Sequence, residues 1–257
     1  MMRKHGKPPY DIVLVHGGPG SAGELEPLAR MLSPEMGVLE PFQTEDSVGG
    51  QIEELKEHIE ENCRVPVTLV GWSWGAWLSM MAASEHPQLI KKLIMVGCAP
   101  LEDRYVPIIM RKRYRRLGTG EIDELKRVTS MMSSPGTSEA VPRRFGELMS
   151  KADSYELIEQ ERPNVIYDLH INRKVWGEAS RMRSTGEILD ILSRVRCPTT
   201  AIHGRNDPHP WEGVKYPLDE LRPDDVFHLL DRCGHAPWLE KHARERFLNL
   251  LKDELDH

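Results

Sequence analysis

The sequence has few cysteines, and none of them is spaced for a metal or redox motif. Its 257 residues include four: Cys63, Cys98, Cys197 and Cys233. No two form a CxxC pair or a metal-ligand spacing, so we expect all four to be reduced and to pack beside strands as small hydrophobic residues. Cys233 is of interest because it lies two residues before His235. The sequence predicts no metal and no cofactor.

The sequence also lacks a long apolar run. The longest apolar stretches, such as 77–83, are far too short to span a bilayer. Residues 1–9 are polar and basic and do not resemble a secretory signal. We therefore expect a soluble, cytoplasmic protein with no membrane partner, and composition within the normal globular range predicts one domain.

The net charge of −6 is unevenly distributed. Residues 101–186 carry 16 Lys/Arg and 13 Asp/Glu, a balance of +3, whereas the rest of the chain has a balance of −9. Five of the six residues 111–116 are basic, but no nucleic-acid motif accompanies them. The cluster therefore predicts a solvated helix face, and we expect no nucleic-acid partner.

Strand patterns alternate with helical patterns, which predicts an α/β fold with a mostly parallel sheet flanked by helices. About six strands are expected, at 10–15, 38–42, 67–70, 92–96, 199–203 and 226–230. Amphipathic or small-residue helices are expected at 24–32, 47–62, 76–85 and 237–255, with acidic residues on the outer face of the second. Residues 101–186 are helical, charged and without a convincing strand. The sequence thus predicts a core of residues 1–100 and 187–257 and an inserted helical lid of residues 101–186.

A Gly-x-Ser-x-Gly motif marks the first catalytic candidate. Gly71-Trp72-Ser73-Trp74-Gly75 follows an apolar strand and precedes a helix, as a nucleophile elbow requires. The tight turn strains the serine, and side chains at the two glycine positions would collide with neighbouring backbone. A glycine-rich turn with a capping serine is the structural alternative, but it predicts no catalytic partners elsewhere.

Catalytic partners are present in the expected order. The loop His16-Gly17-Gly18-Pro19-Gly20 can supply a backbone N–H from Gly18, which with the N–H of Trp74 would form an oxyanion hole. This loop has neither a Lys-Ser/Thr ending nor a G-x-G-x-x-G pattern, which disfavours a phosphate cradle. His16 is expected to order the loop.

His235 follows the last expected strand, and Asp207 follows the strand before it. Parallel strands place such loops at one sheet edge, so these residues predict a general base and the acid that orients it. Asp103 and Glu102 are rival acids because they follow another strand. Asp207 is favoured by the turn sequence Asn206-Asp207-Pro208.

With these motifs in order, the chain resembles the α/β-hydrolase superfamily from residue 10 to residue 251. His-Gly-Gly-Pro-Gly together with Gly-Trp-Ser-Trp-Gly is similar to the proline iminopeptidase branch. Members of that branch carry a strand hairpin before the first strand expected here, so the resemblance implies a sheet trimmed to about six strands. They also bind the amino group of the substrate through acidic lid residues. Glu178 is a possible counterpart, as are Glu139, Glu147 and Glu161.

The sequence predicts a serine hydrolase that cleaves a small, partly apolar ester or amide through an acyl-enzyme. Prolyl aminopeptidase is the alternative, carbon–carbon bond hydrolases are further off, and a non-catalytic binding protein is a different class. Serine at position 73 disfavours relatives that use an aspartate nucleophile. The expected partner is a small molecule or a short peptide, and the sequence gives no oligomeric state. The residues expected to line the substrate pocket are Gly17, Trp72, Tyr167, Trp176, Glu178 and Trp238.

Overall fold

A computed structural model describes residues 1–132, 140–158, 163 and 165–256. Its strands are β1 (Met2–His5), β2 (Tyr10–Val15), β3 (Ser21–Ala22), β4 (Gly37–Pro41), β5 (Val67–Trp72), β6 (Ile90–Val96), β7 (Ile166–Tyr167), β8 (Thr199–Gly204) and β9 (Val226–Leu230). Its α-helices are α1 (Glu26–Leu32), α2 (Val48–Asn62), α3 (Trp74–Glu85), α4 (Val106–Tyr114), α5 (Thr119–Met132), α6 (Ala140–Asp153), α7 (Leu169–Ser184), α8 (Glu187–Arg194), α9 (Glu212–Leu221) and α10 (Arg244–Asp256). Two short 3-10 helices are η1 (Asp103–Tyr105) and η2 (Pro237–Leu239).

The main sheet is mostly parallel, as predicted. Within the described residues it has seven strands in the order β1-β4-β2-β5-β6-β8-β9, and only β1 runs antiparallel to its neighbour. The carboxyl ends of the parallel strands lie at one edge, which is where such sheets carry their sites. The same residues contain no helix of the length and apolarity that a membrane span needs.

The main sheet has one strand that the sequence pattern did not indicate. Residues 2–5 form β1, which pairs with β4 in the register Met2 to Pro41 through His5 to Val38. The segment Met-Arg-Lys-His has no alternating apolar pattern, so only its backbone hydrogen bonds to β4 identify it as a strand.

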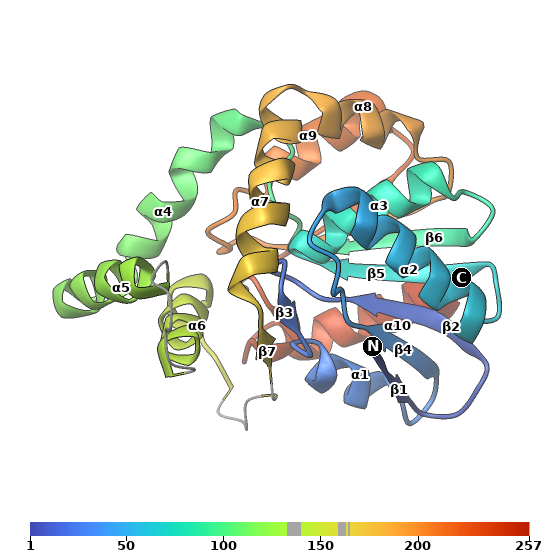
Figure 1. Ribbon diagram of the computed structural model, residues 1–257, viewed down its shortest axis with the longest axis horizontal. Coiled ribbons are helices and arrows are strands. Elements are labelled where there is room, and N and C mark those ends of the chain that lie inside the picture. Colours follow the sequence, from blue (N-terminus) through green and yellow to red (C-terminus); the bar gives the residue numbers. More distant parts are fainter. Residues whose placement is uncertain (133–139, 159–162, 164, 257) are drawn as a thin grey trace.

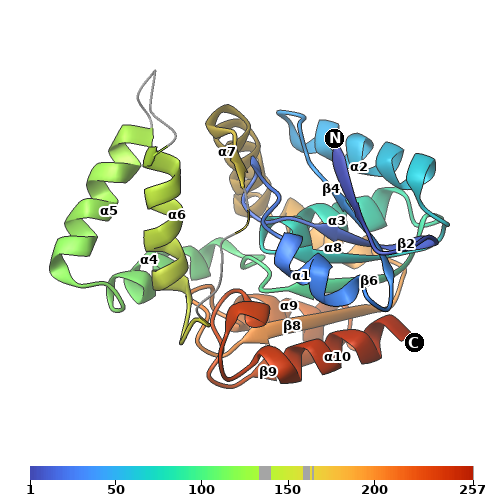
Figure 2. The same ribbon diagram turned by 90° about the horizontal axis from the view of Figure 1, so that it is seen from below.

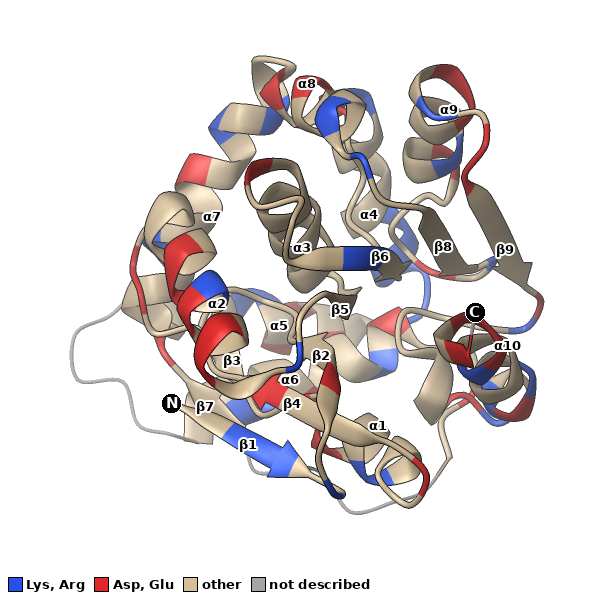
Figure 3. Ribbon diagram, turned by 90° about the vertical axis from the view of Figure 1, so that its right-hand side faces the viewer, with Lys and Arg blue, Asp and Glu red and all other residues tan. Residues whose placement is uncertain are grey.

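Helices cover both faces of the sheet (Figures 1 and 2). Buried side chains of α2, α3, α7, α8 and α9 pack on one face, and those of α1 and α10 pack on the other. The central strands are therefore apolar on both sides, as expected for a parallel sheet buried between helices. Acidic residues lie along the outer side of α2, as predicted (Figure 3).

Residues 101–186 contain two parts with different packing. Side chains of α5, α6 and the turn after α4 form a small apolar cluster of their own, centred on Leu117, Leu125, Leu148 and Ala152. In Figures 1 and 2, α5 and α6 lie beyond α4, to one side of the sheet. By contrast, α7 packs on the main core through Ile171, Val175, Ala179 and Met182. The lid boundaries of 101 and 186 stay a prediction.

Candidate active site

The predicted elbow is a sharp turn between β5 and α3. Ser73 has φ 55° and ψ −115°, a conformation that costs a non-glycine residue about 1–3 kcal/mol. A Cβ on Gly71 would lie 2.2 Å from the Gly75 carbonyl oxygen, and one on Gly75 would lie 2.0 Å from that of Val15. Both glycines are therefore required by close backbone approach, as the motif predicted.

His235 lies over the carboxyl ends of β5 and β6. The indole N–H of Trp72, beside the elbow serine, donates to the His235 carbonyl oxygen over 2.9 Å, and the two rings are 5.1 Å apart. A Cβ on Gly97, just after β6, would lie 2.7 Å from that same carbonyl oxygen. The histidine loop and the elbow are thus in direct contact.

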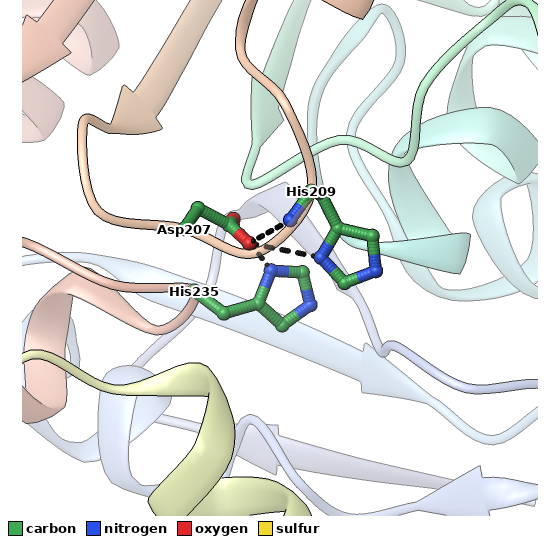
Figure 4. A group of neighbouring side chains, drawn as sticks. All are labelled: Asp207, His209 and His235. Atoms are coloured by element: carbon green, nitrogen blue, oxygen red, sulfur yellow. Dashed lines mark hydrogen bonds and ion pairs between the residues drawn. The ribbon is translucent and has the colours of Figure 1, made fainter. Parts of the chain in front are cut away.

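Asp207, and neither rival acid, is the carboxylate that reaches His235. The Nδ1–H of His235 donates to Asp207 Oδ2 over 2.7 Å (Figure 4). Asp103 instead pairs with Arg183 at 2.7 Å, and Glu102 pairs with Arg104.

The charge of Asp207 is stabilised where it lies. Burial alone would raise the pKa of this carboxyl, but the interactions with His235 and the hydrogen bonds from His209 outweigh burial and hold the pKa well below its usual range. Burial would likewise lower the pKa of His235, but Asp207 raises it above the ordinary value.

The hydroxyl of Ser73 is not engaged by the histidine. Among the described residues neither this hydroxyl nor Nε2 of His235 has a hydrogen-bond partner. In unliganded enzymes catalytic hydrogen bonds are often long and tighten only when substrate binds.

The glycine-rich loop runs beside the elbow. A Cβ on Gly17 would lie 2.7 Å from the Trp72 ring and 3.3 Å from Cβ of Ser73. His16 orders the loop, as expected: its Nδ1 donates to the Gly17 carbonyl oxygen over 2.8 Å, and its Nε2 accepts from the Gln43 N–H over 3.4 Å. Burial lowers the pKa of His16 to about 4, so the ring is neutral.

The start of α7 holds the other side of this loop. The Asp168 N–H donates to the Gly20 carbonyl oxygen over 2.7 Å, and the Asn172 amide donates to that of Pro19 over 2.9 Å. Tyr167 pairs with Ser21 through β7 and β3 and thus lies next to the loop.

Two predicted pocket residues, Trp176 and Glu178, contact α3 and α2. Trp176 packs its ring 6.1 Å from the rings of Trp74 and Trp77, both of which are buried in the main core. Glu178 accepts a 2.9 Å hydrogen bond from the Val48 N–H at the start of α2. These side chains attach α7 to α2 and α3, and their role in lining a pocket stays a prediction.

The remaining candidates are the pocket residue Trp238 and the three other acidic residues considered for binding a substrate amino group. Trp238 is fully buried and packs edge to face on Trp72 at 5.2 Å. Glu147 pairs with Arg144 at 2.9 Å. Glu139 and Glu161 lie outside the described residues.

The basic cluster of residues 111–116 is only in part the solvated surface that the sequence predicted, since Arg111 and Arg115 are exposed but the other three basic side chains are engaged. Arg113 makes two hydrogen bonds to Asp153, of 2.6 and 2.8 Å, and the Asp153 carbonyl oxygen accepts the N–H of His235 over 2.9 Å. Lys112 donates to the Asp207 carbonyl oxygen over 3.1 Å, and Arg116 donates to that of Asn206. Lys112 and Arg116 thus bind the loop that carries the acid, and Arg113 holds Asp153, whose backbone binds the histidine.

Sequence reasoning also missed Glu240, which is fully buried. Its carboxylate accepts 2.8 Å hydrogen bonds from the N–H groups of Gly234, Tyr155 and Glu156. It therefore joins the loop before His235 to the segment that follows α6. Its position five residues after the histidine gave no signal, because its partners come from a segment about 85 residues away.

His209 is the other missed residue. Its Nδ1 and its backbone N–H both donate to Asp207 Oδ1, over 2.9 and 2.8 Å. Asp207, His209 and His235 are also one of two groups among the described residues whose ligand atoms converge within 4.8 Å, as a metal ion would need; the other is Glu53, Glu85 and His86. A histidine two residues from the predicted acid, between two prolines, was the available signal.

Relatives among characterised proteins are distant. Ethanol acetyltransferase 1 from Cyberlindnera jadinii is 29% identical over 120 residues, and the match covers 42% of this chain but only 35% of that protein. Pimeloyl-[acyl-carrier protein] methyl ester esterase from Chromobacterium violaceum is 23% identical over 75% of this chain and 71% of its own length. A 2-hydroxy-6-oxononadienedioate/2-hydroxy-6-oxononatrienedioate hydrolase from Pseudomonas putida is 24% identical over 96% of this chain and 87% of its own length.

Solved structures share the fold over the whole chain. VinJ superposes with a TM-score of 0.69 at 19% identity and covers 99% of this chain and 94% of its own. The esterase EaEST from Exiguobacterium antarcticum gives 0.66 at 17% identity and covers 100% and 95%. The model of the alpha/beta hydrolase family matches residues 12–250. This match spans most of the sequence, and the chain therefore belongs to the alpha/beta hydrolase family.

Proposed function

We propose that the protein is a serine hydrolase that cleaves a small ester or amide through an acyl-enzyme. One observation carries the proposal: His235 donates a 2.7 Å hydrogen bond to Asp207, and the loop of His235 is itself bound by Trp72, next to the strained turn of Ser73. In this mechanism Ser73 attacks the carbonyl carbon, His235 takes the hydroxyl proton and later gives it to the leaving group, and Asp207 holds the tautomer of His235.

The protonation states support these roles. Asp207 is ionised because its pKa is held low, and an ionised carboxylate requires the proton of His235 to be on Nδ1. Nε2 of His235 then carries a lone pair and can act as a base. The same carboxylate stabilises the imidazolium that forms in the transition state.

Backbone N–H groups next to Ser73 are proposed to bind the oxyanion. Trp74 is the first residue of α3, so its N–H is free of the helical ladder and lies at the positive end of the helix dipole. The second donor is expected from Gly18, in the loop whose neighbouring residue Gly17 lies against Ser73. Removing one such donor typically costs 10²- to 10³-fold in kcat.

We propose that the segment 101–186 selects the substrate. Its part α4–α6 has its own apolar cluster, and the Asp153 carbonyl oxygen and the Arg116 side chain attach it to the loops of His235 and Asp207. Tyr167 is the lid residue proposed to line the pocket, since β7 pairs beside the glycine-rich loop. Substitution of Tyr167 should change the ranking of substrates and leave the rate of probe labelling at Ser73 nearly unchanged.

The contacts of Glu178 favour esters over N-terminal peptides. An aminopeptidase of the branch that the sequence resembles needs an acidic side chain for the amino group of the substrate; of the candidates within the described residues, Glu178 is engaged by Val48 and Glu147 by Arg144. One relative carries the name of a methyl ester esterase. We therefore place a small, partly apolar ester first.

Labelling with a fluorophosphonate, followed by hydrolysis of p-nitrophenyl esters of rising chain length, tests the proposal. Wild-type protein should be labelled, and Ser73→Ala should lose labelling and about 10⁴-fold or more of its activity. Ser79→Ala is the control, because Ser79 is buried in the same helix with no hydrogen-bond partner for its hydroxyl among the described residues. Retention of more than a tenth of the rate by Ser73→Ala would exclude Ser73 as nucleophile, and an unlabelled wild type would indicate a binding protein.

A further inference from the structure

Two imidazole rings share the carboxylate of Asp207. Oδ2 accepts from Nδ1 of His235, and Oδ1 accepts from Nδ1 and from the backbone N–H of His209. Figure 4 shows both rings on the same side of the carboxylate, each with Nδ1 toward it and Nε2 away from it. The ring centroids are 4.3 Å apart and the planes are inclined by 31°.

The loop fixes His209 in this position. The residue lies between Pro208 and Pro210, which restrict its backbone. Its carbonyl oxygen accepts a 3.0 Å hydrogen bond from Nε2 of His203, which is buried in β8. His209 itself is 8% exposed, so little of its environment is solvent.

The charge states follow from these contacts. An ionised carboxylate only accepts hydrogen bonds, so both rings carry a proton on Nδ1. Burial lowers the pKa of His209 to about 4, and the charge of His235 acts in the same direction. His209 is therefore a neutral donor near pH 7, and its N–H withdraws part of the negative charge that His235 would otherwise experience.

Resting on the proposed function, we propose that His209 is a positioning residue: it holds Oδ1 of Asp207 so that Oδ2 is aimed at His235, and it moderates the charge of that carboxylate. The expected consequence concerns the pKa of His235. Without the side-chain donor, Oδ1 keeps only the backbone N–H, the carboxylate acts more strongly on His235, and the imidazolium is favoured. The free base then persists only at higher pH.

Other charged groups surround the two rings and stay constant in the test. Asp153 raises and Arg113 lowers the pKa of His235, while Arg113 also lowers that of His209. Lys112 binds the Asp207 backbone, and His203 lies with its Nε2 3.4 Å from Oδ2. None of them is altered by a substitution at position 209.

The test uses two variants of similar size. His209→Asn places an amide N–H where Nδ1 lies, whereas His209→Leu places a methyl group there. We expect His209→Leu to lose about 10- to 100-fold in kcat/KM, the effect of removing one hydrogen bond to a charged group. The acid limb of its pH profile should move to higher pH, and His209→Asn should stay within about threefold of wild type with an unmoved limb.

Titration of ¹⁵N-histidine-labelled protein by NMR gives a readout that does not depend on turnover. The pKa of His235 should rise in His209→Leu and not in His209→Asn. If both variants lose activity equally with no change in that pKa, the ring serves only packing and the proposal is wrong, as it is if His209→Leu behaves like wild type. If wild-type protein neither hydrolyses esters nor reacts with the probe, the proposed function fails, and the same titration still decides the role of His209.

Discussion

Removal of either partner of the ion pair between Arg113 on α4 and Asp153 at the end of α6 should strongly lower the free energy of unfolding. The two side chains are 14% and 12% exposed and form a bidentate contact of 2.6 and 2.8 Å. Burial alone would lower the pKa of Arg113, but Asp153 outweighs it and raises that pKa. Both groups are therefore charged in a poorly solvated place.

The expected cost follows from these surroundings. Two charges about 4 Å apart attract by about 4 kcal/mol at an effective dielectric constant near 20, and desolvation offsets much of this. Removal of one partner leaves the other charge buried and uncompensated, which costs about 3–5 kcal/mol. We expect Arg113→Met and Asp153→Asn each to lower the free energy of unfolding by about 3 kcal/mol, and the double variant to lose about 2 kcal/mol less than their sum.

Urea unfolding at pH 7 measures these differences, and the chain offers a matched control. Arg144 makes a bidentate contact of 2.7 and 2.9 Å with Glu124 in the same helical segment, but these side chains are 42% and 28% exposed. Arg144→Met should cost less than about 1 kcal/mol. If Arg113→Met costs no more than Arg144→Met, the basic cluster is a solvated helix face after all and the reasoning is refuted.

Three further results are expected. Asp207→Asn should lower kcat/KM of ester hydrolysis by about 10⁴-fold while Asp103→Asn changes it little, because only Asp207 contacts the histidine; the reverse ranking would move the acid to the other strand. Gly75→Ala should abolish activity and lower the free energy of unfolding by at least about 1–3 kcal/mol, since its Cβ would lie 2.0 Å from a carbonyl oxygen of β2. A variant that keeps both its ester hydrolysis and its melting temperature would contradict this. Because the folded protein holds the pKa of His16 near 4, below its value of 6.5 in the unfolded chain, the stabilisation from neutral His16 is complete above pH 6.5 and is lost as pH falls toward 4. Between pH 7 and pH 5 this group alone should cost about 2 kcal/mol of unfolding free energy, and a His16→Asn variant whose urea midpoint falls as steeply as that of wild type would contradict the assignment.

Some features of the protein are predictable from short stretches of sequence. The elbow is one, because the clash that requires Gly71 is with Gly75, only four residues further on, although the clash that requires Gly75 is with Val15 of β2. The parallel sheet is another, because apolar runs separated by helical periods can be buried only between layers of helices. The order of Ser73, Asp207 and His235 fits the rival Asp103 equally well, and it was the turn sequence Asn206-Asp207-Pro208 that favoured Asp207 as the partner of the histidine.

Other features depend on contacts between distant segments, which no local pattern records. β1 has no apolar alternation and is a strand only because β4 offers it hydrogen-bond partners. Glu178 meets Val48 across 130 positions, and Arg113 meets Asp153 across 40, so a helix period could not show which charges would be buried.

The surroundings of Asp207 show most clearly which features are set by local sequence and which by tertiary contacts. The sequence by itself determined that Asp207 would stand on a tight turn after a strand, since turn chemistry is local. Only the tertiary structure decided that His209 and His235 would stack and share its carboxylate, because that arrangement requires the loops after β8 and β9 to be packed together at one edge of the sheet.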